Sequence, residues 1–206
     1  AMKEIIAHNA PGKRANLRMV LTGGEAEGGS EHVPGRETFF ITAEPAVPLP
    51  QALYEKGASL ITFEHERLLA ESKTVDYTTA VMLQKLRREK GALEILYVSK
   101  GRVLEYATSN IFLVKDGTLF TPSDDVLKGV TRTVALELAE GVYPAQEAPV
   151  SIEDVFGADE VFITSSFKDI VPIFSIDGKE VGGGAPGPIT KDLMRKFTEY
   201  AERPLK

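Results

Sequence analysis

Three groups of residues in the middle of the chain have side chains that could form one reactive site. Lys73 lies in ESKTVDY, Glu105 lies in LEYATSNIF, and a glycine turn, LKGVTR, begins at Leu127. A partly desolvated lysine amine is a nucleophile that forms a Schiff base with an aldehyde. A buried carboxylate can keep a ring nitrogen protonated, and the free N–H groups of a helix start bind phosphate. Together, the three groups suit a cofactor with an aldehyde, a basic ring nitrogen and a phosphate.

Each of these residues also has an ordinary structural explanation. Lys73 could be a solvated surface lysine, and Glu105 could be an outward-facing residue of an alternating strand. Gly129 would permit a tight turn that leaves the N–H groups of Val130 and Thr131 unpaired at the start of a helix. The hydroxyl of Thr131 could contact a phosphate or cap its own helix.

Other side chains with chemical potential give a weaker pattern. The segment ITSSFKD places the hydroxyls of Thr164, Ser165 and Ser166 at the end of a strand, where ligand-binding hydroxyls often gather. The histidines are far apart in the sequence and form no paired motif: His8, His32 and His65. The chain has no cysteine, which excludes disulfides, thiolate metal sites and a cysteine nucleophile. We therefore expect no metal site.

The elements that must position these residues follow no regular order. Asp76 to Lys90 has apolar residues at helical spacing, as do the segments that begin near Gly129 and Pro188. Asp-Gly pairs at 116–117 and 177–178 predict hairpin turns. Strands are predicted in LRMVL, TFFITAEP, SLITFE, EILYVS, RVLEYA, SNIFLVK, TLFTP, DEVFITS and DIVPIFSI. This mixture predicts the α+β class rather than a regular βαβ alternation.

The composition restricts the class of protein. The 206 residues are 43% hydrophobic, and no stretch approaches the roughly 20 apolar residues that a membrane helix requires. The net charge of −6 is spread along the chain, which argues against nucleic acid as the main partner. No signal peptide is recognisable, and the absence of cysteine fits a reducing compartment. We therefore expect a cytoplasmic protein without a membrane or nucleic-acid partner.

Several stretches of the sequence follow the motifs of one known family. They are RLLAESKTVDY, GRVLEYATSNIFLVKDGTLFTP, VLKGVTRTVALELA, ADEVFITSS and GGGAPGPIT, and they span residues 67–190 with the family's spacing. In these stretches the chain resembles the class IV aminotransferases, which are the fold type IV pyridoxal-phosphate enzymes. The resemblance implies the C-terminal domain of the D-amino acid aminotransferase-like fold, with mixed and antiparallel strands and interspersed helices.

The resemblance also implies residue roles. Lys73 matches the lysine that forms the internal aldimine with pyridoxal 5'-phosphate and later moves the proton, and Glu105 matches the glutamate bonded to the pyridine nitrogen. Asp76 stands where many members have asparagine. Further cofactor contacts are implied for Leu127, Val130, Thr131, Ser166 and Tyr77, and substrate contacts for Ser166 and Phe167.

The activity implied by the resemblance is transamination of an amino acid with a 2-oxo acid in a homodimer. The LTGG and GPIT segments favour a branched-chain substrate. Aminodeoxychorismate lyase and D-amino acid aminotransferase activity remain alternatives within the family. A non-catalytic domain for dimerisation or interaction is the alternative outside it.

The glycine-rich segment 23–37 is the best candidate for a boundary within the chain. Family members have a small N-terminal domain with a phosphate-binding arginine, and no arginine in residues 3–37 lies in a matching motif. We expect residues 1–30 to be the end of that small domain plus a hinge, and residues 31–206 to be the cofactor-binding domain. The resemblance then implies little or no activity for the chain alone.

Overall fold

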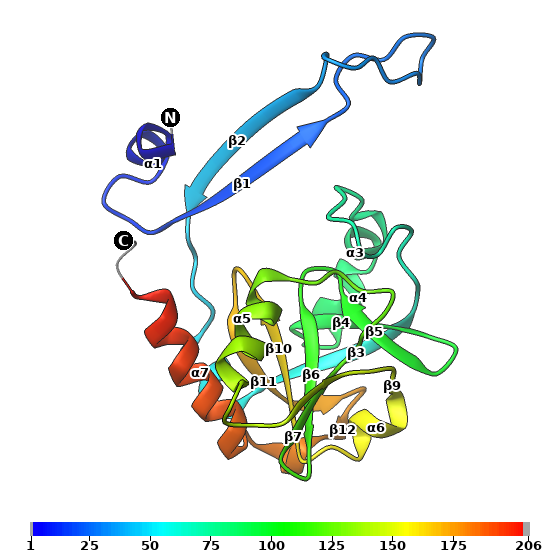
Figure 1. Cartoon of the computed structure of the whole chain (residues 1–206), viewed down its shortest axis with the longest axis vertical. Coiled ribbons are helices and arrows are strands. Elements are labelled where there is room, and N and C mark those ends of the chain that lie inside the picture. The colour runs from blue at the N-terminus through cyan, green and yellow to red at the C-terminus, as the bar shows by residue number, and fades with distance from the viewer. Residues whose placement is uncertain (1, 204–206) are drawn as a thin grey trace. The chain divides into compact units, whose positions relative to one another are not determined.

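The computed structural model describes residues 2–203, and these residues form two compact units (Figure 1). The first unit is Ala1–Pro48 and the second is Leu49–Lys206. The division lies at Pro48 rather than near residue 30, because the strand that follows the glycine-rich segment pairs with the strand that precedes it.

The first unit is a helix followed by a β-hairpin. It contains α1 (Met2–Asn9), β1 (Ala15–Thr22) and β2 (Thr38–Pro45), and the two strands pair antiparallel along their whole length. Both strands are predicted by the sequence, whereas α1 is not. The hairpin exposes several large apolar side chains: Met19, Leu21, Phe39 and Phe40.

The second unit is built on a ten-stranded sheet in the order β8-β7-β6-β10-β11-β3-β4-β5-β9, with β12 paired to β11. The strand pairs β11–β3, β3–β4 and β7–β8 are parallel and the others are antiparallel, which confirms the mixed α+β prediction. The elements of this unit are α2 (Gln51–Lys56), β3 (Ala58–Glu64), α3 (Thr78–Met82), α4 (Gln84–Glu89), β4 (Glu94–Ser99), β5 (Arg102–Tyr106), β6 (Asn110–Lys115), β7 (Thr118–Thr121), α5 (Val130–Ala139), β8 (Ala145–Glu147), β9 (Val150–Ser151), α6 (Ile152–Phe156), β10 (Glu160–Ser165), β11 (Asp169–Ile176), β12 (Lys179–Glu180), the 3₁₀ turn η1 (Gly182–Gly184) and α7 (Pro188–Ala201).

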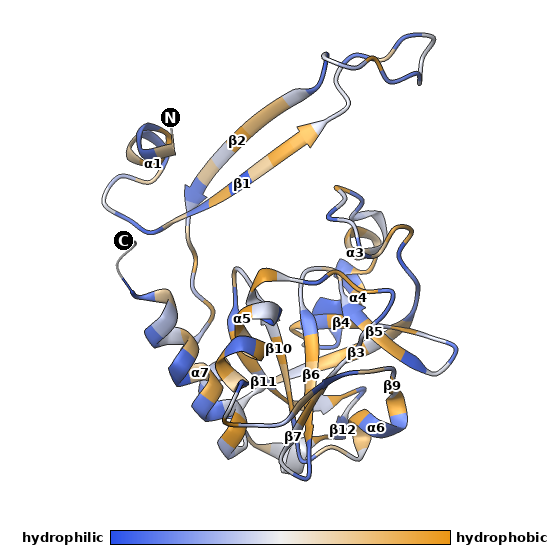
Figure 2. Cartoon of the chain, viewed as in Figure 1, coloured by the Kyte–Doolittle hydropathy of each residue, from blue (hydrophilic) through white to orange (hydrophobic). Residues whose placement is uncertain are grey.

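The sheet of the second unit is buried on both faces. Successive side chains of a strand point to opposite faces, so Val161 and Ile163 of β10 belong to one apolar cluster and Phe162 belongs to another. Phe162 lies opposite Phe112 of β6, and their rings stack at 4.9 Å. α5 and α7 cover this second cluster, and Figure 2 shows hydrophobic and hydrophilic residues alternating along the ribbon of α7.

Local sequence signals locate most element boundaries correctly. Both Asp-Gly pairs form hairpin turns, with Asp116 and Asp177 at φ values of 49° and 51°. The sequence predicts one continuous helix from Asp76 to Lys90, and this prediction is wrong. The chain turns at Leu83, whose N–H lies within reach of the carbonyls of both Thr79 and Val81, and the segment forms the two short helices α3 and α4.

None of the helices in residues 2–203 is long and apolar enough to cross a membrane. The feature that matters for the site is the meeting of three strand ends. β5 ends at Tyr106, β6 begins at Asn110, and the register places Asn110 opposite Thr164 near the end of β10.

Candidate active site

A cavity of about 320 Å³ lies where β5, β6 and β10 meet the start of α5. We call it the main cavity. Its lining brings together residues from loops, strands and a helix that are distant in the sequence. Six residues predicted from the sequence line it: Lys73, Glu105, Leu127, Val130, Thr131 and Ser166.

Glu105 is the buried acid of the main cavity. Its side chain is 4% exposed, and its Oε1 accepts a hydrogen bond of 2.8 Å from Nη1 of Arg67. Its Oε2 accepts the N–H of Leu127 at 2.9 Å and the amide of Asn110 at 3.5 Å. Burial raises the pKa of Glu105 to about 7, although Leu127, Arg67 and Lys73 each act to lower it. A cationic group bound in the cavity would lower this pKa and keep the carboxylate charged.

Arg67 is a site residue that the sequence analysis did not predict. Its guanidinium pairs with Glu105 through Nη1 and donates through Nη2 to the carbonyl of Ser72 at 2.9 Å. Ser72 immediately precedes Lys73, so Arg67 joins the buried carboxylate to the loop that carries the lysine. The motif RLLAESK contains this arginine, but nothing in its spacing indicates that it contacts an acid 38 residues later.

Lys73 is exposed and lies in the loop that leads into α3. Its side chain forms no hydrogen bond or ion pair with the rest of the described chain, but it is close enough to Glu105 to lower the pKa of that carboxyl. A lysine amine without a partner at the wall of a cavity is available to react with a bound aldehyde.

The start of α5 provides the anion-binding part of the main cavity. Gly129 is the N-cap with extended backbone angles, and no side chain caps the helix, so the predicted capping role of Thr131 is not observed. The N–H groups of Val130 and Thr131 are therefore open to a ligand. A Cβ at Gly129 would lie 2.4 Å from Oδ1 of Asn110, so a larger residue would disturb the turn.

The hydroxyls of β10 complete this part of the wall. Thr164, Ser165 and Ser166 all line the main cavity. Thr164 is 1% exposed, and its Oγ1 has no hydrogen-bond partner in the described chain. A buried hydroxyl without a partner costs free energy, and a ligand oxygen at this position would satisfy it. The open helix start and this hydroxyl therefore fit a ligand that carries a phosphate.

Two predicted site residues lie elsewhere. Tyr77 is at the N-cap of α3 and lines a neighbouring cavity of about 160 Å³, which shares Arg67 and Ala107 with the main cavity. Phe167 is 50% exposed and is not part of the main cavity lining.

The fold and the site define a mixed α+β domain with a lysine, a buried acid and a phosphate-binding helix start on one cavity. A model of the amino-transferase class IV family matches residues 1–176, and the chain belongs to this enzyme family. The resemblance inferred from the sequence motifs is thus confirmed.

The chain is also similar to individual proteins of this family that are named for an activity. The chain is 36% identical over 196 residues to a protein of Methanocaldococcus jannaschii named branched-chain-amino-acid aminotransferase, covering 90% of this chain and 67% of that protein. It is 30% identical over 197 residues to D-alanine aminotransferase of Bacillus licheniformis, covering 94% and 69%. A solved branched-chain amino acid aminotransferase of T.th. with pyridoxamine 5'-phosphate has a TM-score of 0.85 at 26% identity, covering 99% of this chain and 71% of that one.

The raised pKa of Glu105 predicts a fall in stability with rising pH. The unfolded chain loses the Glu105 proton near the ordinary pKa of 4.5, whereas the folded chain keeps it until pH reaches about 7. The folded state binds more protons in that window, so its free energy of unfolding decreases from pH 4.5 to 7 and then levels off. The shift corresponds to at most about 3 kcal/mol. Urea unfolding of the unliganded chain across this range measures the decrease.

The variant E105Q isolates this contribution, because glutamine does not titrate and keeps an oxygen that accepts from Leu127. We expect a flatter pH profile for E105Q and an unchanged profile for E137Q, which alters an exposed glutamate of α5. Parallel profiles for wild type and E105Q would contradict the assignment.

Proposed function

We propose that this chain provides the cofactor site of a pyridoxal-phosphate-dependent transamination between an amino acid and a 2-oxo acid. The observation that carries the proposal is the main cavity, where Lys73, Glu105 and the uncapped start of α5 line one space. Family membership supports the same reading, since a solved relative is named with pyridoxamine 5'-phosphate.

Each residue has a defined task in this proposal. Pyridoxal phosphate, when bound, supplies an electron sink for the bond that breaks at the substrate Cα. The amine of Lys73 would hold the aldehyde of this group and, when free, would move the proton at the substrate Cα. Glu105, held by Arg67, would pair with the ring nitrogen and favour its protonated form. The amides of Val130 and Thr131, with the hydroxyl of Ser166, would hold the phosphate, and the side chain of Leu127 would pack against the ring.

The proposal also includes the substrate, the cellular location and the oligomeric state. A branched-chain amino acid is the first candidate, because the Methanocaldococcus jannaschii relative and the T.th. structure are named for it. D-Alanine is the second candidate, supported by the Bacillus licheniformis relative. We further propose a cytoplasmic homodimer in which the first unit, up to Pro48, contains the end of a small N-terminal domain and the second unit is the cofactor-binding domain.

Covalent labelling tests the role of Lys73. We expect pyridoxal phosphate to give a visible absorbance band with the chain, and borohydride reduction to fix the label on Lys73. K73A should lose both signals. K85A is the matched control, because Lys85 is 87% exposed and lies outside the main cavity. Label on other lysines in the wild-type chain, with Lys73 unmodified, would refute the assignment.

The unpaired hydroxyl of Thr164 predicts opposite effects on stability and on cofactor binding. T164V removes a buried polar group without a partner, so the unliganded chain should be as stable as wild type or more stable. The same change removes a hydrogen bond to a charged ligand, so the Kd for pyridoxal phosphate should rise about tenfold.

Thermal unfolding without ligand and absorbance titration with pyridoxal phosphate measure these two quantities. T198V is the control, since Thr198 is an exposed threonine of α7. A T164V variant with wild-type affinity would show that this hydroxyl does not contact the cofactor.

A single-turnover assay distinguishes the candidate substrates. The loaded chain is mixed with L-leucine, L-valine or D-alanine, and the decay of the visible band is followed. We expect decay with the two L-amino acids at a rate about tenfold above that with D-alanine, a difference of about 1.4 kcal/mol in the barrier. Faster decay with D-alanine would favour the second candidate. Pyruvate release from aminodeoxychorismate without a 2-oxo acid would instead indicate the lyase reaction.

A further inference from the structure

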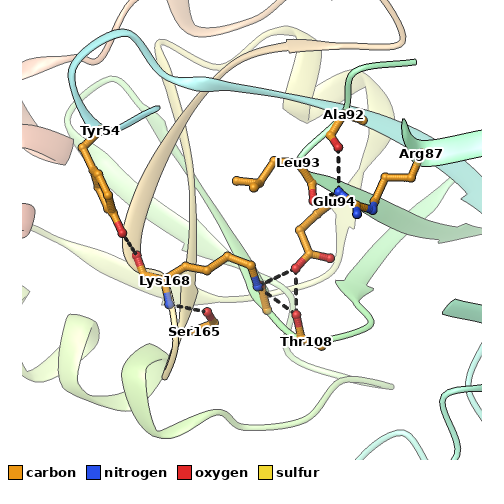
Figure 3. A network of polar contacts seen from close by, with 9 residues as sticks. Tyr54, Arg87, Ala92, Leu93, Glu94, Thr108, Ser165 and Lys168 are labelled. Carbon is orange, nitrogen blue, oxygen red and sulfur yellow. Dashed lines mark hydrogen bonds and ion pairs between the residues drawn. The ribbon is translucent and has the colours of Figure 1, made fainter. Parts of the chain in front are cut away.

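A buried ion pair lies behind the wall of the main cavity. Nζ of Lys168 is 2.6 Å from Oε1 of Glu94, and the two side chains are only 15% and 10% exposed (Figure 3). Glu94 begins β4, and Lys168 lies in the turn between β10 and β11. Neither residue lines the main cavity, so the pair has no direct contact with a ligand there.

The pair holds the turn between β5 and β6. The hydroxyl of Thr108 donates to Oε1 of Glu94 at 2.7 Å and accepts from Nζ of Lys168 at 2.9 Å. The hydroxyl of Ser109 makes the same two contacts at 3.4 and 3.3 Å. Both Thr108 and Ser109 line the main cavity, so the pair acts on the wall from behind.

Lys168 also holds the turn that follows β10. Its N–H donates to Oγ of Ser165 at 3.1 Å, and its carbonyl accepts from the hydroxyl of Tyr54 at 3.1 Å (Figure 3). Ser165 and Ser166 line the main cavity. One lysine therefore connects two turns that form different parts of the same wall.

Packing alone does not support this wall. A third cavity, of about 330 Å³, lies beside the pair and is lined by Glu94, Lys168, Ala107 and Thr108 among others. Ala107 and Thr108 thus separate two cavities. Because this third cavity lies behind Ala107 and Thr108, the ionic network restrains their position on a side where packing is incomplete. Burying two charges carries a desolvation cost, and apolar residues of similar volume are often as stabilising.

We propose that Glu94 and Lys168 are positioning residues that fix the turn at 107–109 relative to the turn at 165–168. Their role is to set the width of the main cavity. This role rests on the proposed pyridoxal-phosphate site. The pair would change the affinity for the cofactor without contacting it.

The double variant E94L/K168M tests this role, because it replaces the pair by apolar side chains and leaves no unpaired buried charge. We expect a urea midpoint close to that of wild type. We also expect backbone amide exchange about tenfold faster at Tyr106, which donates to the carbonyl of Ser109, and at Lys168. The Kd for pyridoxal phosphate should rise at least about fivefold. NMR-detected exchange and absorbance titration provide the two measurements.

Two further variants separate positioning from general stability. K168R keeps the charge and should retain wild-type exchange and affinity. K115M removes a half-exposed ion pair with Asp159 at the far end of β6 and should change neither quantity. If the double variant does not fold, E94Q serves in its place. It keeps the side-chain volume and an acceptor oxygen, and exchange at Tyr106 and Lys168 should rise about threefold.

The outcomes distinguish the inference from the proposed function. Wild-type exchange at both amides in a folded variant without the pair would overturn the positioning role. Wild-type cofactor affinity together with fast exchange would also overturn it, because the turns would then not set the cavity. Fast exchange in the variant, with no cofactor binding by the wild-type chain, would support the restraint on the turns and refute the proposed function.

Discussion

The burial of the Glu105 carboxylate is the constraint on which the site depends. A charge taken out of water must be paired and hydrogen-bonded, or the group becomes neutral. Glu105 receives a guanidinium from the loop at Arg67, an N–H from the turn at Leu127 and an amide from Asn110 at the start of β6. Satisfying this single acid therefore brings three chain segments to the end of β5. The main cavity is the space that those segments enclose.

The main cavity contains both groups that are paired within the chain and groups that have no partner there. Buried polar groups in native proteins are normally hydrogen-bonded, and Glu94, Lys168 and Asn110 follow that rule. The amine of Lys73 and the hydroxyl of Thr164 have no partner within the described chain, and the start of α5 has no side-chain cap. These unsatisfied groups line the same cavity as groups that are fully satisfied. A ligand that binds here therefore meets groups without a partner on a wall held by groups that are paired.

Local patterns predicted the elements well where the physical cause is local. The Asp-Gly turns form because aspartate and glycine tolerate positive φ. The helix predicted over Asp76 to Lys90 breaks at Leu83, whose side chain packs against a small apolar cluster with Ile61 and Tyr97. That contact is tertiary, so the periodicity of the segment could not reveal it. Tyr77, the N-cap residue of α3, lines the neighbouring cavity instead of the main cavity, which its place in the sequence did not indicate.

The sequence by itself determined the identity of the reactive groups, since a lysine, an acid and a glycine-led helix start have fixed chemistry wherever they lie. Its motifs also determined the family, because their order and spacing are properties of the chain alone. Only the tertiary structure decided which neighbours those groups have. Arg67 reaches Glu105, and Lys168 reaches Glu94, from segments that come close only after the sheet has formed. Burial, pairing and the pKa of Glu105 follow from that adjacency, because desolvation and Coulomb interactions depend on distance in space and not on separation along the chain.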